Sequence, residues 1–274
     1  MLEQLQAACS NLVSLGEKAA QLGFQLEHVE TIGSTSTQLM QDALAGVTGP
    51  KWLVADEQVD GKGRRGRHWN SPKGNLYSSL LLNDPAPSEK IAQLSFVLAL
   101  ALRDAVMAVS VVGQGPTSEE VEVKWPNDLM IRGKKCAGLL LEGGLKGQAR
   151  FVVIGLGVNI VSHPEKSNHP ASNLTDLGIS TSTEHFFPFL SDAIAQRLEQ
   201  WAMGQGFAQI RADWLAHAFK MGQDMRINTS TESYIARLDG VDESGSLLVD
   251  YMGRSRTITA GEIFPLDIQT GSSD

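Results

Sequence analysis

The sequence predicts an α+β fold in two parts, a large mixed part followed by a small all-β part. Helical and strand-like patterns are interspersed through residues 1–221, whereas only short strands separated by turns follow. The 274 residues, 42% of them hydrophobic, suffice for one large core and one small core. We therefore expect a first domain over 1–221, a β domain over 222–268 and a tail over 269–274.

Composition and charge exclude several classes of protein. Acidic residues outnumber basic residues by 31 to 23, so the net charge of −8 opposes general binding to a polyanion. The two cysteines, Cys9 and Cys136, lie far apart and predict no disulfide framework, as in a reducing cytoplasm. No secretory signal is visible, and the apolar stretches are expected to be too short to cross a bilayer. The sequence thus predicts a cytoplasmic protein that binds neither DNA nor a membrane.

Hydrophobic periodicity predicts the elements of the first part in chain order. Apolar residues at intervals of three or four indicate helices, and alternation or short apolar runs indicate strands. The expected elements are a helix over 1–23, a strand over 24–30, a helix over 32–44, a strand over 52–55, a buried helix over 91–109, a half-buried strand over 121–124, a hairpin over 129–141, a buried strand over 151–160, and helices over 186–203 and 207–219.

The second part shows strand signals alone. The expected strands lie over 225–227, 234–238, 246–249 and 254–258. Turn residues separate them at 242–245 and at Gly253. This spacing predicts a compact β module of some fifty residues.

A basic, glycine-rich loop follows the strand over 52–55. Between Gly61 and Arg67 it holds three glycines and four cations. Glycine lets the backbone approach a ligand closely, and guanidinium groups bind phosphate or carboxylate oxygens. The pattern also fits an ordinary solvated basic loop. Apolar strand-like sequence follows at once, so a loop mounted on the core that binds a small anion is the favoured interpretation.

Hydroxyl side chains cluster where the helix over 32–44 begins. Ser34, Thr35, Ser36 and Thr37 fit either ordinary helix capping or a site for a polar ligand at the helix N-terminus. The glycines of the buried strand, Gly155 and Gly157, indicate close approach of a ligand or backbone rather than a dinucleotide-binding motif.

Two adjacent lysines precede the returning strand of the hairpin, and two histidines lie in a later loop. Because strand side chains alternate, Lys135 should share its face with Ala137 and Leu139, and a buried ammonium there needs an anionic partner. His163 and His169 lack metal-ligand spacing. Of Lys134 and Lys135, Lys135 is therefore the stronger functional candidate, and no metal site is expected at the two histidines.

Three stretches resemble one protein family in sequence, order and spacing. They are GKGRRGRHWNSPKGNLYSSLLL, KWPNDLMIRGKKCAGLLLEG and VVIGLGVNI, preceded by IGSTS. Together they resemble the biotin protein ligases, also called biotin–[acetyl-CoA carboxylase] ligases, over roughly residues 24–266. Only 23 residues precede Phe24, too few for a three-helix DNA reader, so the form without the N-terminal repressor domain is expected.

The resemblance implies a fold and a reaction. The fold is a mixed central sheet with flanking helices, related to class II aminoacyl-tRNA synthetases, plus a C-terminal SH3-like barrel. The reaction converts biotin and ATP, with Mg²⁺, to biotinyl-5′-AMP and then transfers biotin to a lysine of biotin carboxyl carrier protein. A monomer or homodimer is expected. The alternatives are a lipoate or octanoate ligase of the same fold and a non-enzymatic biotin-binding regulator.

The resemblance also implies roles for individual residues. Lys135, Lys62 and Arg64 would be catalytic, and Asp128 would hold Mg²⁺. The biotin-binding residues would be Ser34, Thr35, Ser36, Gln58, Lys62, Gly63, Arg64, Lys135, Gly138, Gly155 and Gly157. The nucleotide-binding residues would be Arg65, Arg67, Trp69, Asn127 and Asp128, with Trp69 packed over the closed loop.

Three positions depart from the family pattern. Lys62 stands where arginine is usual, which would replace a bidentate contact by a point charge. Ser36 replaces a common asparagine, and Asp60 stands at a position that is often small. Cys136, beside Lys135, is expected to be a small buried hydrophobe rather than a reactive thiol.

Overall fold

The computed structural model describes residues 13–110, 115–165 and 170–266. Part of the helix expected over 1–23 lies outside these residues, as do Cys9, His169 and the tail over 269–274. The described part is α2 (Glu17–Gln21), which packs on α5 (Thr183–Trp201). Two backbone N–H groups bind α5 side chains, Gly16 N to Ser191 Oγ at 2.8 Å and Ala19 N to Asp192 Oδ1 at 2.9 Å.

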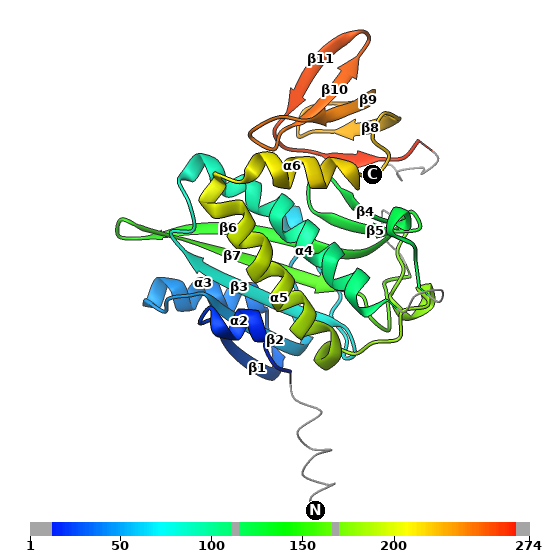
Figure 1. Ribbon diagram of the computed structural model, residues 1–274. Helices are drawn as coiled ribbons and strands as arrows, with labels where there is room; N and C mark the ends of the chain where they lie inside the picture. Colours follow the sequence, from blue (N-terminus) through cyan, green and yellow to red (C-terminus); the bar gives the residue numbers. More distant parts are fainter. Residues whose placement is uncertain (1–12, 111–114, 166–169, 267–274) are drawn as a thin grey trace, which may run out of the picture.

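A seven-stranded mixed sheet forms the centre of the first part (Figure 1), in the order β1-β2-β3-β7-β6-β5-β4. Only β1 and β2 run parallel, and every other neighbouring pair is antiparallel. The strands are β1 (Gln25–Ile32), β2 (Lys51–Gln58), β3 (Leu76–Asn83), β4 (Val121–Lys124), β5 (Asp128–Ile131), β6 (Lys134–Lys146) and β7 (Ala149–Val158). The predicted strands are confirmed, with β1, β2 and β6 longer than expected.

Helices cover both faces of this sheet. On one face α3 (Thr35–Ala45) buries Leu39 and Ala43 against β2, β3 and β7. On the other face lie α4 (Leu94–Val109) and α5, with α6 (Phe207–Ala216) packed on α4 (Figure 1). The core on this second face continues into the C-terminal part.

The segment Ser88–Val109, which combines the 3₁₀ turn η2 (Ser88–Gln93) with α4, corrects one expectation. Its length and mean hydropathy of 1.6 would allow it to cross a membrane, so the expectation that every apolar stretch is too short was wrong. Within its most apolar 18-residue window, 67% is buried inside the protein. A helix packed between a sheet and other helices is apolar all round for that reason.

The C-terminal part is a five-stranded antiparallel sheet in the order β11-β10-β9-β8-β12, which confirms the all-β expectation. The strands are β8 (Asp224–Asn228), β9 (Ser233–Val241), β10 (Leu247–Tyr251), β11 (Arg254–Ile258) and β12 (Glu262–Phe264). Of these strands, β12 was not predicted. The β9–β10 turn docks on the first part, where Trp125 Nε1 donates to the Gly245 carbonyl at 3.2 Å. Gly245 has φ +88°, and a Cβ there would lie 2.7 Å from the Phe96 ring.

The hairpin of β5 and β6 contains a register shift that the sequence did not reveal. Leu129 lies opposite Ala137, but the next residue, Met130, lies opposite Lys135, so Cys136 is an extra residue in β6. A bulge of this kind reverses the alternation of side chains. Lys135 therefore does not share the face of Ala137 and Leu139. It lies on the side of Gly138, where a Cβ would be 3.2 Å from the lysine Nζ.

Candidate functional site

A single cavity of about 450 Å³ collects the candidate residues at one end of the central sheet. It has two chemically different ends, which we name here. The hydroxyl end consists of Ser34, Thr35, Ser36, Gln58 and Ser79. The cation end consists of Arg64, Arg67, Lys124, Lys135, Asp128 and Glu262.

The hydroxyl end starts at the N-terminus of α3. Ser34 caps this helix, because its Oγ accepts a hydrogen bond from Thr37 N at 3.4 Å, so the capping interpretation holds. Ser34, Thr35 and Ser36 are also buried and line the cavity, so the ligand-site interpretation is compatible with it. Short polar side chains at a helix start can thus serve the helix and the cavity together.

A hydrogen-bond chain fixes the floor of the hydroxyl end. Gln58 Oε1 accepts from Thr35 N at 2.8 Å and from Thr35 Oγ1 at 3.1 Å, and Thr35 Oγ1 bonds Ser79 Oγ at 2.8 Å. Gln58 Nε2 donates to Ser71 Oγ at 3.1 Å, and Ser71 Oγ donates to the Trp69 carbonyl at 2.8 Å. The network joins α3, β2 and β3 to the end of the basic loop, so these groups are held before a ligand arrives.

The basic loop is folded back on itself above the cavity. Gly63 N donates to Arg67 O, and Trp69 N donates to Gly61 O, both at 2.8 Å. The turn between them is η1 (Arg64–Gly66), in which Arg65 has φ +57°. The loop therefore has a defined shape, and its cations have defined directions.

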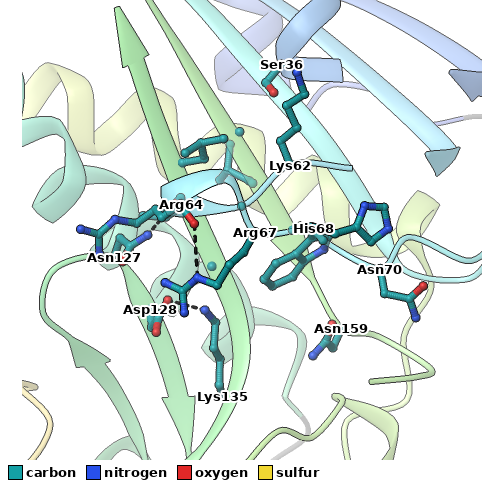
Figure 2. A pocket seen from close by; sticks show the side chains of 18 of the residues that line it. Ser36, Lys62, Arg64, Arg67, His68, Asn70, Asn127, Asp128, Lys135 and Asn159 are labelled. Carbon is teal, nitrogen blue, oxygen red and sulfur yellow. Dashed lines mark hydrogen bonds and ion pairs between the residues drawn. The ribbon is translucent and has the colours of Figure 1, made fainter. Parts of the chain in front are cut away.

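The tip of this loop contacts the C-terminal part of the chain. Figure 2 shows the loop residues Arg64 and Arg67 that make these contacts. Arg64 donates to Asn127 Oδ1 at 3.1 Å and to the Gly261 carbonyl at 3.4 Å. Glu262 of β12 forms ion pairs with Arg67 and, at 3.7 Å, with Arg65. Burial lowers the pKa of Arg64, and the nearby carboxylates of Glu262 and Asp128 oppose that shift.

Asp128 lies between two lysines at the end of the sheet. Its carboxylate pairs with Lys135 Nζ at 2.7 Å (Figure 2), which supplies the anionic partner expected for that lysine. Lys124 faces Asp128 across the β4–β5 ladder. Only 3% of Lys124 is exposed, and its Nζ lies 5.4 Å from the Phe264 ring centroid of β12. Burial lowers the pKa of Lys124 to about 8. The strand expected to be half-buried is thus mostly buried, and its lysine is buried with it.

Trp69 lies in the wall of the cavity. Its indole packs against β6 and β7, where a Cβ on Gly157 would lie 2.5 Å from the ring and one on Gly138 would lie 3.2 Å from it. Lys135 Nζ is 5.4 Å from the ring centroid. The indole therefore forms part of the cavity wall, and the glycines are needed to admit it. Its packing over the closed loop stays a prediction.

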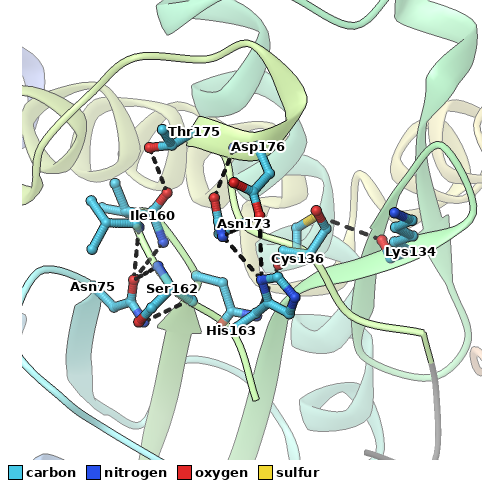
Figure 3. Close-up of polar contacts among 12 residues, drawn as sticks. Asn75, Lys134, Cys136, Ile160, Ser162, His163, Asn173, Thr175 and Asp176 are labelled. Atoms are coloured by element: carbon cyan, nitrogen blue, oxygen red, sulfur yellow. Dashed lines mark hydrogen bonds and ion pairs between the residues drawn. The ribbon is translucent and has the colours of Figure 1, made fainter. Parts of the chain in front are cut away.

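The described part of the loop that follows β7 forms another wall of the cavity (Figure 3 shows contacts within this loop). Asn75 Oδ1 accepts from the backbone N–H groups of Ile160, Val161 and Ser162 at 2.8–3.2 Å. Asn173 Nδ2 lies 3.0 Å from His163 Nδ1, so this histidine binds within the loop. Asn159, Pro164 and Ala171 line the cavity.

Lys135 is tied to the same wall through its backbone. Lys135 N donates to Pro170 O at 2.7 Å, and Ser172 N donates to Lys135 O at 3.0 Å. The neighbouring Cys136 is fully buried, and burial raises the pKa of its thiol to about 12. The thiol therefore stays protonated, in agreement with its expected role as a small hydrophobe.

Comparison with known proteins places this site in a family. The biotin/lipoate A/B protein ligase family matches residues 29–159. A biotin–[acetyl-CoA-carboxylase] ligase of Paracoccus denitrificans is 35% identical over 238 residues, which are 84% of this chain and 96% of that protein. The chain belongs to the biotin protein ligase family.

Other biotin protein ligases agree over nearly the same span. A biotin–[acetyl-CoA-carboxylase] ligase of Mycobacterium tuberculosis is 29% identical and covers 88% of this chain and 89% of its own length. The crystal structure of a biotin protein ligase from Aquifex aeolicus in complex with biotin and ATP superposes with a TM-score of 0.73. It is 25% identical, and the match covers 87% of this chain and 97% of that one. The fold class expected from the sequence is thereby confirmed.

In this biotin protein ligase the cavity unites nearly all candidate site residues. Arg65 alone among them does not line it and instead contacts Glu262. Their roles stay predictions. Three further lining residues were not predicted: Ser79 and Asn159, which lie within the matching stretches, and Glu262, which lies outside them. Lys124, which opens the KWPND motif, was misjudged as part of a half-buried strand.

Proposed function

We propose that this biotin protein ligase activates biotin with ATP to biotinyl-5′-AMP and transfers the biotinyl group to a lysine of a carboxylase carrier protein. The observation that carries this proposal is the joining of two opposite recognition chemistries in one cavity of a chain from this family. The hydroxyl end suits a neutral polar ring system, and the cation end suits a carboxylate and phosphates.

In the first step a biotin carboxylate oxygen attacks the α-phosphorus of ATP. A new C–O–P linkage forms, the bond to the bridging oxygen breaks, and pyrophosphate leaves with that electron pair. Lys135, Lys62 and Arg64 hold the carboxylate and α-phosphate together, so their positive charges offset the charge that develops on the phosphate oxygens. Ser34, Thr35, Ser36 and Gln58 hold the ring of biotin.

In the second step the ε-amine of the acceptor lysine attacks the acyl carbon of biotinyl-5′-AMP. The amide bond forms, the acyl C–O bond breaks, the amine loses a proton, and AMP leaves. Trp69 and the loop over 61–67 exclude water from the mixed anhydride before the acceptor arrives. No covalent bond to the enzyme is required.

Mg²⁺ is the cation we expect with ATP, and Asp128 is the residue that would hold it. The described residues contain no group of three or more histidine, cysteine or carboxylate side chains that could hold a metal ion by themselves. A single carboxylate joined by phosphate oxygens and water is the usual Mg²⁺ environment beside a nucleotide. Mg²⁺ would neutralise phosphate charge when bound.

The test is incubation of the full chain with ATP, Mg²⁺, biotin and an apo carrier domain, followed by intact mass spectrometry. One biotinyl group on the carrier is the expected result. Parallel assays of ATP–pyrophosphate exchange with biotin, lipoate and octanoate identify the acid. Exchange with lipoate or octanoate in place of biotin would indicate the related ligase, and biotin binding without exchange would indicate a regulator. We propose the cytoplasm as its location.

A further inference from the structure

Lys62 gives the cavity a primary amine at a position where the family pattern usually has arginine. We propose that Lys62 is a site of self-modification, whose ε-amine takes the biotinyl group from biotinyl-5′-AMP when no carrier protein is present. The acceptor group is then chemically the same as the lysine of the carrier. This inference rests on the proposed function and adds a second acceptor, which lies inside the enzyme.

The first argument is the position of Lys62. This residue lines the cavity and is also exposed to solvent. Its backbone forms a bridge with His68, which fixes the start of the side chain within the basic loop. Figure 2 shows the side chain directed toward Ser36 of the hydroxyl end. The amine and the proposed adenylate therefore share one cavity.

The second argument comes from a comparison of the three lysines that line the cavity, Lys62, Lys124 and Lys135. Lys135 Nζ pairs with Asp128 at 2.7 Å, so it would have to break an ion pair in order to attack a ligand. Lys124 is only 3% exposed. The ammonium of Lys62 makes no hydrogen bond or ion pair with any residue that the structure describes. Its flexible stem can therefore turn toward a ligand without breaking a contact.

The third argument is the chemistry of a primary amine. A guanidinium stays protonated, so an arginine at this position could hold the adenylate without reacting with it. A lysine can hold the same oxygens as a cation, but once it has lost a proton it is a nucleophile. Because the adenylate is bound in the same cavity, the attack is intramolecular, which greatly raises the effective concentration of the amine.

The proposed step needs no reagent beyond the adenylate. The neutral ε-amine of Lys62 attacks the acyl carbon of biotinyl-5′-AMP, and a C–N bond forms. The acyl C–O bond breaks, its electron pair stays on the phosphate oxygen, and AMP leaves. The proton that the amine loses passes to solvent, to which Lys62 is exposed. The product is an uncharged amide in place of an ammonium.

This change of charge has a consequence for the enzyme. Lys62 is one of the three cations that we expect to hold the carboxylate and the α-phosphate, so its acylation should slow the formation of new adenylate. A carrier protein competes for the same adenylate and protects Lys62. An enzyme without an acceptor should therefore stop itself from consuming ATP.

The experiment supplies biotinyl-5′-AMP to the full chain in the absence of a carrier, followed by denaturation, intact mass spectrometry and peptide mapping. We expect one biotinyl group, with at least about tenfold more label on Lys62 than on any other lysine, because a bound reactant has a much higher effective concentration. The rate should not depend on protein concentration, and an excess of apo carrier domain should suppress the label. Biotin-dependent ATP–pyrophosphate exchange should fall in proportion to the fraction modified.

Two variants serve as references. Lys62→Arg keeps the positive charge but lacks the amine, so it should bind the supplied adenylate and gain no covalent mass. Lys73→Arg removes an exposed amine that pairs with Glu30 outside the cavity lining, and it should be labelled as the wild type is. Native mass spectrometry shows whether each variant holds the adenylate. If Lys62→Arg does not fold, the peptide map of the wild type still locates the label and decides the question.

Three outcomes would overturn the inference while leaving the proposed function intact. The first is wild-type protein that holds the adenylate and gains no covalent mass. The second is equal labelling of Lys62 and Lys73, which would indicate reaction with adenylate released into solution. The third is a label on Lys135 in place of Lys62. If the wild type shows no biotin-dependent exchange, the proposed function itself fails, and this inference fails with it.

Discussion

The hydroxyl end and the cation end of the cavity are built in opposite ways. At the hydroxyl end, neighbouring elements α3, β2 and β3 supply neutral groups that already bond to one another, through Gln58 and Thr35 above all. At the cation end, charges come from the basic loop, the β4–β5 turn, β6 and β12, the last of these in another sheet. A rigid neutral network favours selective binding, whereas assembled charges favour a change in rate.

The largest effect should come from the cation end. Lys135→Ala removes the ammonium that pairs with Asp128 and faces the reacting groups. We expect adenylation, measured by ATP–pyrophosphate exchange, to fall by about 10²–10³-fold, as for loss of one preorganised charge donor. Biotin affinity in calorimetry should change far less. An effect below about tenfold would contradict a catalytic role for Lys135.

The next effect should come from the hydroxyl end and should have the opposite signature. Thr35→Val keeps the shape but removes the hydroxyl that bonds Gln58 and Ser79. Gln58 Oε1 keeps its bond from Thr35 N, but Ser79 Oγ loses its partner. Leaving a buried group unpaired costs about 1–3 kcal/mol, and we expect the disturbed hydroxyl end to bind biotin more weakly in calorimetry. The exchange rate at saturating biotin should not change. A lower exchange rate with unchanged biotin affinity would contradict the proposal that the hydroxyl end governs binding and the cation end governs the rate.

Arg64 of the basic loop contacts both Asn127 and the segment that leads into β12, so its loss should affect the adenylate formed in the first step. Arg64→Ala removes contacts to Asn127 and to the Gly261 carbonyl. We expect dissociation of biotinyl-5′-AMP to become about tenfold faster, in line with one charge-assisted contact, while biotin alone is held nearly as before. Stopped-flow release measures the first quantity and calorimetry the second. Equal losses for both ligands would refute the assignment.

The smallest effect should come from the ion pairs between Glu262 and the basic loop. Glu262→Gln neutralises the carboxylate that pairs with Arg67 and Arg65, whose side chains are each 42% exposed to solvent. Exposed ion pairs contribute about 0–1 kcal/mol, so release of the adenylate should accelerate by only a few fold. High salt should mimic the change in wild type and have little effect on the variant. A salt response that persists undiminished in the variant would argue against this contact.

Local pattern predicted most elements and the candidate site, because each depends on residues close in sequence. Spacing identified α4 and α5, and the loop over 61–67 was evident from its glycines and cations. Glu262 was not predictable in the same way. It meets Arg67 from a strand 195 positions later, and nothing in the three residues of β12 marks them as part of a cavity.

Two errors came from applying regular alternation to irregular strands. The extra residue Cys136 turns Lys135 to the side of Gly138, away from the side on which period-two counting had placed it. Lys124 is buried although it alternates with valines, because β12 and the Phe264 ring cover the end of β4. Both effects arise from tertiary contacts that alternation cannot encode.

The C-terminal sheet supplies Glu262 and Ile263 to the cavity wall, although the chain reaches it only after α6. A polypeptide cut between residues 221 and 224 would therefore yield two pieces, neither with a whole cavity. That junction is thus a natural place to engineer a split enzyme, in which labelling reports the meeting of two fused proteins.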